Sequence, residues 1–97
     1  MTIKTSRLDI AEWLETDADI QEFLAETARE GTPSDLVHAL NIAARARGMS
    51  EIARQSGLTR ASLYKSLSES GNPQFDTIAR ICGAFGMKLT VTPQHTA

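Results

Sequence analysis

Residues 49–67 of this chain, MSEIARQSGLTRASLYKSL, have the spacing of two short helices joined by a tight turn. Two such helices can cross steeply only if the first packs through a small residue and the turn accepts an unusual backbone conformation. Ala53 and Gly57 occupy those two positions. Ser50 is a suitable N-cap for a first helix that runs to about Gln55. The segment therefore predicts a helix-turn-helix.

The second helix of this motif is expected to begin after Thr59, which is placed to cap it, and to end near Leu67. Leu63 and Leu67 lie four residues apart and predict the buried side of this helix. The usual pattern has an apolar residue where this chain has Ser66, and Leu67 is expected to make that contact instead. The opposite side presents Arg60, Ala61, Tyr64 and Lys65. This mixture is typical of a helix that reads bases in the major groove. A helical hairpin in an ordinary all-α domain is the alternative.

Arg60 is the strongest candidate for base recognition, because one guanidinium can bond O6 and N7 of guanine together. A phosphate contact or a solvated side chain is the alternative for Arg60. Lys65 is interpreted as a phosphate contact, and Tyr64 as a side chain that packs on a sugar or a thymine methyl group.

The net charge of −2 hides two parts of opposite sign. Residues 1–30 contain three basic and eight acidic side chains, a net charge of −5, whereas residues 31–97 contain seven basic and four acidic ones, a net charge of +3. A basic part preceded by an acidic segment indicates two partners of opposite charge, one of them nucleic acid. The acidic run could equally be a solvated helix face.

A length of 97 residues predicts a single domain, and the single cysteine, Cys82, excludes an internal disulfide and a multi-cysteine zinc site. We expect Cys82 to be a small buried residue on a helix. His38 and His95 have no supporting ligands nearby in sequence, so no metal and no other cofactor is expected. Residues 1–10 are too polar for a signal peptide and no apolar run approaches a membrane span, which predicts a cytoplasmic protein.

Helix start and stop signals divide the chain into short helices over about 9–14, 17–30, 33–47, 50–55, 60–67 and 75–85. Thr16 and Thr32 are the predicted N-caps of the second and third helices. Trp13, the sole tryptophan, is interpreted as packing the first helix against the core, with a partner interface as the alternative.

Residues 87–92 alternate between apolar and polar side chains and predict a strand that stops at Pro93. A single strand leaves its backbone unpaired, so it needs a mate, either its own copy in a two-fold dimer or residues 2–5; the dimer is favoured. The expected fold class is thus an all-α helix-turn-helix bundle in one domain, 1–97. It consists of acidic N-terminal helices (1–31), a core (32–86) and a short C-terminal β-strand (87–93).

The helix-turn-helix, the continuation SESGNPQFDTIARICGAFGMKLTVTP (residues 68–93) and the opening over residues 9–14 together resemble the HigA-like addiction-module antidote proteins, a branch of the Xre/lambda-repressor-like family. The resemblance covers nearly the whole chain, and the GNP loop followed by a helix and G-x-K-L-x-V is its most specific part. It implies a five-helix lambda-repressor-like DNA-binding core. It also implies a small toxin partner resembling the HigB/RelE ribonucleases, and repression of the operon that encodes both proteins.

The resemblance also implies which residues touch DNA. The positions that match the family's groove-facing residues are Thr59, Arg60, Ala61, Tyr64 and Lys65. Ser50 and Asn72 match positions that commonly touch phosphate. Gln74 departs from the Ser or Thr expected as the cap of the following helix, which should weaken that cap.

The leading hypothesis is an antitoxin of a type II toxin–antitoxin module. It would bind double-stranded operator DNA as a homodimer and neutralise a RelE/HigB-like toxin through its acidic N-terminal region. A stand-alone or phage-type helix-turn-helix repressor without a toxin, and a protein-interaction module that has lost DNA binding, are the alternatives. No nucleophile–base pair, carboxylate pair or phosphate loop of an enzyme is recognisable in the sequence, so no catalytic residue is predicted.

Overall fold

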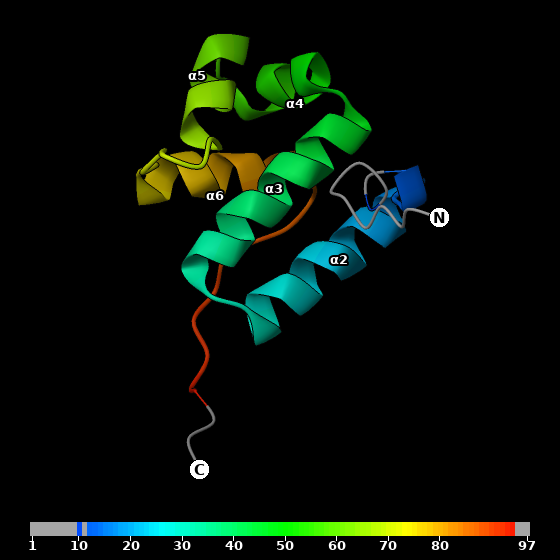
Figure 1. Ribbon diagram of the computed structural model, residues 1–97, viewed down its shortest axis with the longest axis vertical. Helices are drawn as coiled ribbons and strands as arrows, with labels where there is room; N and C mark the ends of the chain where they lie inside the picture. The colour runs from blue at the N-terminus through cyan, green and yellow to red at the C-terminus, as the bar shows by residue number, and fades with distance from the viewer. Residues whose placement is uncertain (1–9, 11, 95–97) are drawn as a thin grey trace, which may run out of the picture.

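The computed structural model describes residue 10 and residues 12–94, and this part of the chain forms a bundle of short helices. The fully described helices are α2 (Asp17–Glu30), α3 (Pro33–Arg47), α4 (Met49–Ser56), α5 (Arg60–Ser66) and α6 (Phe75–Ala84). Helix α3 lies at the centre, with α2 packed along one side of it and α4, α5 and α6 on the other (Figure 1). This arrangement places α5 on the far side of α3 from α2.

Reciprocal hydrogen bonds start the two longest described helices, at the N-caps Thr16 and Thr32 that the sequence predicted. Thr16 accepts the backbone N–H of Asp19 at 3.0 Å while the Asp19 carboxylate accepts that of Thr16 at 3.1 Å. Thr32 and Asp35 form the same pair at 3.1 and 2.9 Å. Each pair satisfies two backbone donors that a helix start otherwise leaves open. Gln74 makes no such bond at the start of α6, so the predicted weak cap is confirmed.

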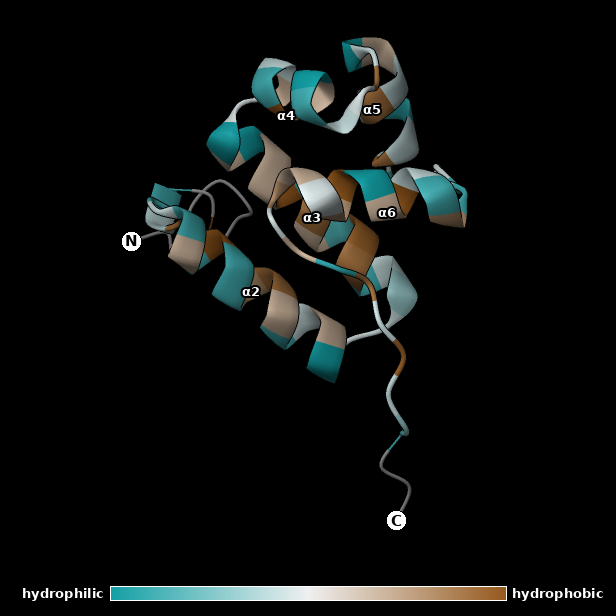
Figure 2. Cartoon of the chain, turned by 180° about the vertical axis from the view of Figure 1, so that it is seen from behind, coloured by the Kyte–Doolittle hydropathy of each residue, from teal (hydrophilic) through white to brown (hydrophobic). Residues whose placement is uncertain are grey.

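The core takes fully buried side chains from four helices and from the residue that follows α5. These are Leu40, Ile52, Leu63, Leu67 and Ile81. Ile20 and Leu24 of α2 join the same cluster, and each helix carries hydrophilic residues as well (Figure 2). Cys82 is buried there too, and burial raises the pKa of its thiol, which confirms its prediction as a packing residue.

Two polar contacts fix α2 to the rest of the bundle. Asp17, in its first turn, forms an ion pair with Arg47 at the end of α3. Gln21 donates from Nε2 to the Phe85 carbonyl at 2.9 Å, just beyond α6. Together with the burial of Ile20 and Leu24, these contacts make α2 part of the core rather than an appendage.

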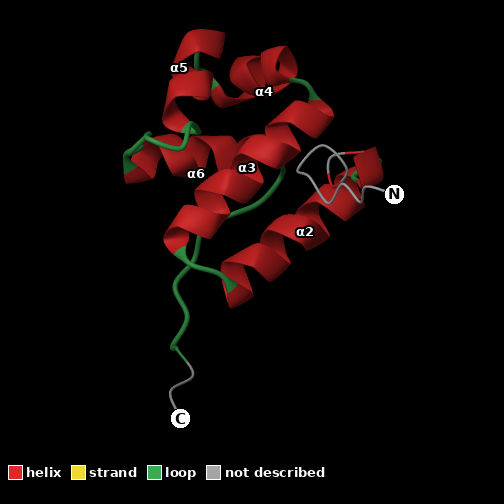
Figure 3. Cartoon of the chain, viewed as in Figure 1, coloured by secondary structure: helices red, strands yellow, loops and turns green. Residues whose placement is uncertain are grey.

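The predicted C-terminal strand is wrong: no strand is present in residues 12–94 (Figure 3). After Gly86 the chain leaves the helices as an irregular segment that points away from the bundle. Leu89 packs against the core, but Val91 is 94% exposed. The alternating pattern therefore has no neighbouring strand in the described chain to complete a hydrogen-bonded ladder. The all-α part of the expected fold class is confirmed.

Two exposed aromatic residues lie at the ends of helical segments. Trp13 is 76% exposed, so its interpretation as a core-packing residue is wrong. Phe75 is 75% exposed, because it stands at the first position of α6, beyond the edge of the core. Residues 10, 12 and 13 are helical as predicted. Asp9, where that helix was predicted to begin, His95 and the proposed mate at residues 2–5 lie outside the described residues. No described helix is long and apolar enough to cross a membrane.

Candidate nucleic-acid interface

The turn between α4 and α5 is closed by Gly57, which has the left-handed conformation that the sequence predicted, with φ +75°. The backbone N–H of Leu58 reaches the Ala53 carbonyl at 2.9 Å, and that of Gly57 reaches the Arg54 carbonyl at 3.3 Å. These bonds satisfy carbonyl groups that the end of α4 would otherwise leave open. The turn thereby fixes where α5 begins relative to α4.

Ser50 does not have its predicted place as N-cap. Helix α4 already begins at Met49, and Gly48, with φ +113°, is its N-cap and makes no side-chain cap bond. The N-cap lies two residues earlier than predicted, because Gly48, which directly follows α3, caps both helices. Ser50 therefore lies exposed in the first turn of α4.

Helix α5 is held by the buried residues that the sequence predicted. Thr59 caps it by accepting the backbone N–H of Ser62 at 3.0 Å, while Leu63 and Leu67 are buried. The residues expected on the other side, Arg60, Ala61, Tyr64 and Lys65, are all exposed. The structure thus presents the predicted polar side of α5 to solvent.

Arg60 and Tyr64 are joined on this exposed side. The Arg60 guanidinium donates from Nη2 to the Tyr64 hydroxyl at 3.1 Å, and its Cζ lies 5.5 Å from the centre of the Tyr64 ring. Their separation of four residues places them one above the other on a helix. The sequence analysis did not predict this contact, although the spacing of four residues between Arg60 and Tyr64 could have indicated it.

A long-range bond that sequence reasoning missed anchors the other end of α5. Asn41 of α3 donates from Nδ2 to the Leu67 carbonyl at 3.1 Å, and its Oδ1 is buried with no hydrogen-bond partner in the described chain. The residues are 26 positions apart, so no local pattern indicates the contact.

Two further cations lie on the helices around this turn. Arg54 is bound to Glu51 at 2.6 Å, and that hydrogen bond lowers the pKa of the Glu51 carboxyl below its ordinary value. Arg80 of α6 bonds Asp76 at 3.1 Å, and its Nη1 lies beside the turn, 3.5 Å from where a Cβ on residue 57 would stand. Arg80 was not among the predicted site residues.

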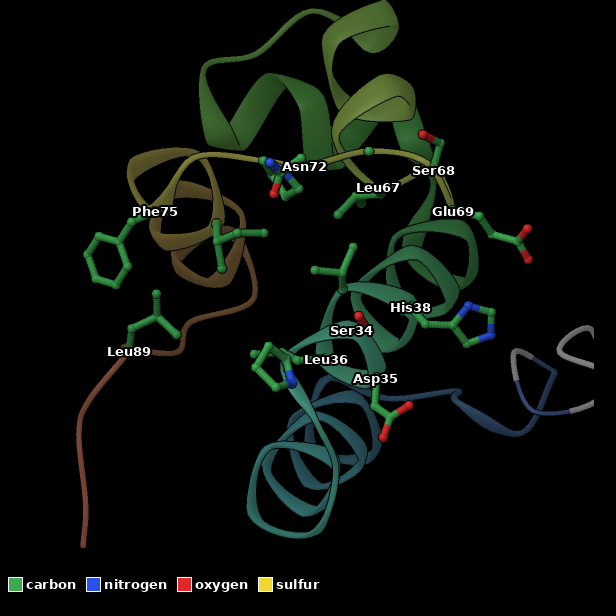
Figure 4. A pocket seen from close by; sticks show the side chains of 15 residues that line it. Ser34, Asp35, Leu36, His38, Leu67, Ser68, Glu69, Asn72, Phe75 and Leu89 are labelled. Carbon is green, nitrogen blue, oxygen red and sulfur yellow. The ribbon is translucent and has the colours of Figure 1, made fainter. Parts of the chain in front are cut away.

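Asn72 lies exposed in the loop between α5 and α6, at the rim of a groove of about 690 Å³. Leu36 and Ile78 contribute to its apolar lining, and Phe75 and Leu89 lie on one side of it (Figure 4). Asn72 is therefore separated from α5 by part of the loop, although both are exposed.

Helix α2 has an acidic face, formed by the exposed carboxylates of Glu22, Glu26 and Glu30. These residues are four apart and lie opposite the buried Ile20 and Leu24. Glu15, just before the helix, is exposed as well. The described residues contain no group of three side chains that could hold a metal ion.

The fold and the exposed side of α5 define a class: small all-helical proteins with two short helices joined through a left-handed glycine. A family model described as "Probable addiction module antidote protein" matches residues 4–93, and the chain belongs to that family. A protein of Haemophilus influenzae named "Uncharacterized protein" is 40% identical over 97 residues, which is all of both chains. No solved structure matches significantly. Because an antidote counteracts a toxin, membership implies a cognate toxin partner.

The geometry of the turn gives a test of the helix pair. Gly57→Ala should lower the free energy of unfolding by about 1–2 kcal/mol, because an L side chain is strained at positive φ. The added Cβ itself meets only Arg80 Nη1 at 3.5 Å, an ordinary contact, so the effect comes from the backbone. Gly83→Ala is the matched control: it lies in α6 with nothing within 4 Å, and should raise stability by about 0.5–1 kcal/mol. Urea denaturation measures both free energies of unfolding. Equal changes in Gly57→Ala and Gly83→Ala would contradict the left-handed turn at Gly57.

Proposed function

We propose that this chain is a HigA-like, Xre-type antitoxin of a type II toxin–antitoxin module, which binds the operator of its own operon and represses it. The observation that carries the DNA-binding part is the exposed side of α5, where Arg60, Tyr64 and Lys65 stand together on a helix held by buried leucines. Direct base recognition requires such a helix to protrude with its polar side free.

In this proposal the side chains of α5 have separate tasks. Arg60 reads a guanine, Lys65 neutralises a phosphate, and Ala61 and Tyr64 contact a methyl group or a sugar. Thr59 contributes its hydroxyl hydrogen, since its oxygen already accepts the Ser62 N–H. Ser50 and Asn72, both exposed, contact the phosphate backbone on either side.

We propose further that two chains bind one operator as a homodimer. Phe75 is exposed at the rim of the apolar groove near Leu89, and Val91 is almost fully exposed two residues beyond. Exposed apolar side chains together with an apolar groove suit a self-complementary two-fold contact with a second copy. A dimer also matches two operator half-sites about one duplex turn apart.

The proposed toxin is a small basic ribonuclease of the RelE/HigB kind, and the surface that binds it is the acidic face of α2. A protein that holds RNA must carry positive charge, which the exposed carboxylates Glu22, Glu26 and Glu30 complement. Because operator DNA and an RNA-cleaving toxin are both found in the cytoplasm, we propose that the chain acts there. We propose no catalytic activity for it.

The DNA-binding proposal predicts that the chain binds a duplex from upstream of its own gene more tightly than a scrambled one, with two chains per duplex. Arg60→Ala should reduce this preference by about 5- to 150-fold, because a bidentate contact to guanine is lost. Lys65→Ala should weaken binding to both duplexes alike and reduce the salt slope by about one. Fluorescence anisotropy over a salt series measures the affinities, and sedimentation equilibrium gives the stoichiometry.

Lys88→Ala is the control for Lys65→Ala, since Lys88 is an exposed lysine on the C-terminal segment beyond α6. It should leave affinity and salt slope unchanged. Equal affinity of the unaltered chain for the upstream and the scrambled duplex would overturn the repressor proposal.

The toxin proposal predicts that Glu22→Gln with Glu26→Gln weakens binding to the basic protein encoded beside this gene by about 2- to 30-fold at low salt, from two exposed ion pairs. The difference should shrink as salt screens the charges. Point substitutions are preferable to deletion of residues 1–30, because Ile20 and Leu24 belong to the core. Asp76→Asn removes an exposed carboxylate from α6 and is the matched control. Unchanged affinity of the double variant by calorimetry would exclude this face.

A further inference from the structure

We propose that Tyr64 is a positioning residue that holds the Arg60 guanidinium ready to contact one guanine, so that sequence preference depends on the pair rather than on Arg60 alone. The proposal rests on the DNA-binding function above and goes beyond it, because it assigns Tyr64 a task carried out through another side chain.

The first support is the geometry of the pair. Nη2 of Arg60 donates to the Tyr64 hydroxyl at 3.1 Å, and the guanidinium carbon stands 5.5 Å from the ring centre, within the range of a cation–π contact. A hydrogen bond and a ring contact to the same partner together restrict the long arginine side chain. Tyr64 is itself anchored one turn along α5, next to the buried Leu63.

The second support is the contrast with other arginines of the chain. Arg29, Arg47, Arg54 and Arg80 each form an ion pair with a carboxylate. Arg60 and Arg45 form none in the described part of the chain, and of these two only Arg60 has a side-chain partner there, a neutral hydroxyl. The pair with Tyr64 therefore orients the guanidinium without cancelling its charge, which stays available to an acceptor on a ligand.

The third support is a count of donors. A guanidinium has five N–H groups, and the bond to Tyr64 uses one of those on Nη2. Four N–H groups therefore remain open, and one on Nη1 together with the second on Nη2 can form a fork. Two parallel acceptors, such as O6 and N7 on the major-groove edge of guanine, match that fork. An arginine side chain loses much rotamer entropy when it binds. A partner that already restricts the side chain before binding lowers this entropy cost.

The test is a double-mutant cycle on the upstream duplex, in which single guanines are replaced by 7-deazaguanine to remove N7. At the contacted guanine the unaltered chain should lose about 2- to 12-fold in affinity, because one of the two acceptors of the bidentate contact is removed. Tyr64→Leu should reduce this penalty by about 2- to 5-fold, the value of an exposed cation–π contact. Tyr64→Phe keeps the ring and should have a smaller effect. In an Arg60→Ala background, Tyr64→Leu should change the penalty no further.

A penalty as large in Tyr64→Leu as in the unaltered chain would overturn the positioning role while DNA binding stands. Equal effects of Tyr64→Leu with and without Arg60 would overturn it too, because Tyr64 would then act independently. Failure of the unaltered chain to prefer the upstream duplex would instead overturn the proposed function. A second measurement needs no DNA: the Arg60 side-chain Nε–H order parameter by NMR should fall in Tyr64→Leu, and an unchanged value would contradict the pairing.

Discussion

The attachment of α5 to the core through Leu63 and Leu67 is the constraint on which the rest of the account depends. Both side chains are buried, and the Leu67 carbonyl is additionally held by Asn41 of α3. The left-handed turn at Gly57 fixes the other end of the helix. A helix of seven residues has little stability of its own, so these contacts determine both its formation and the direction of its exposed side chains.

Helix α3 separates two surfaces of different charge. The acidic face of α2 lies on one side, and α5, with Arg60 and Lys65 exposed, lies on the other. The ion pair between Asp17 and Arg47 joins the acidic segment to the basic one. The charge division seen in the sequence therefore corresponds to a division in space within one core, as a protein with two partners of opposite charge would require.

Local signals predicted the helices well, because caps such as Thr16, Thr32 and Thr59 act within three or four residues. The prediction of a strand over 87–92 was wrong because it rested on the alternation of apolar and polar side chains alone. A strand also needs a neighbouring strand to bond its backbone, and local sequence does not specify one. The exposure of Trp13 and the Asn41–Leu67 bond depend on tertiary packing in the same way. Membership in the antidote family agrees with the expected antitoxin class, while the DNA contacts remain predictions.

The most direct test of the account is whether the chain binds operator DNA and its cognate toxin at once. Sedimentation velocity with a fluorescent upstream duplex and a toxin carrying a second dye measures both in one experiment. The account predicts one boundary that contains both dyes, because the two surfaces lie on opposite sides of α3. Toxin that displaces the chain from DNA by competing for the same surface, or that never sediments with the chain, would contradict it.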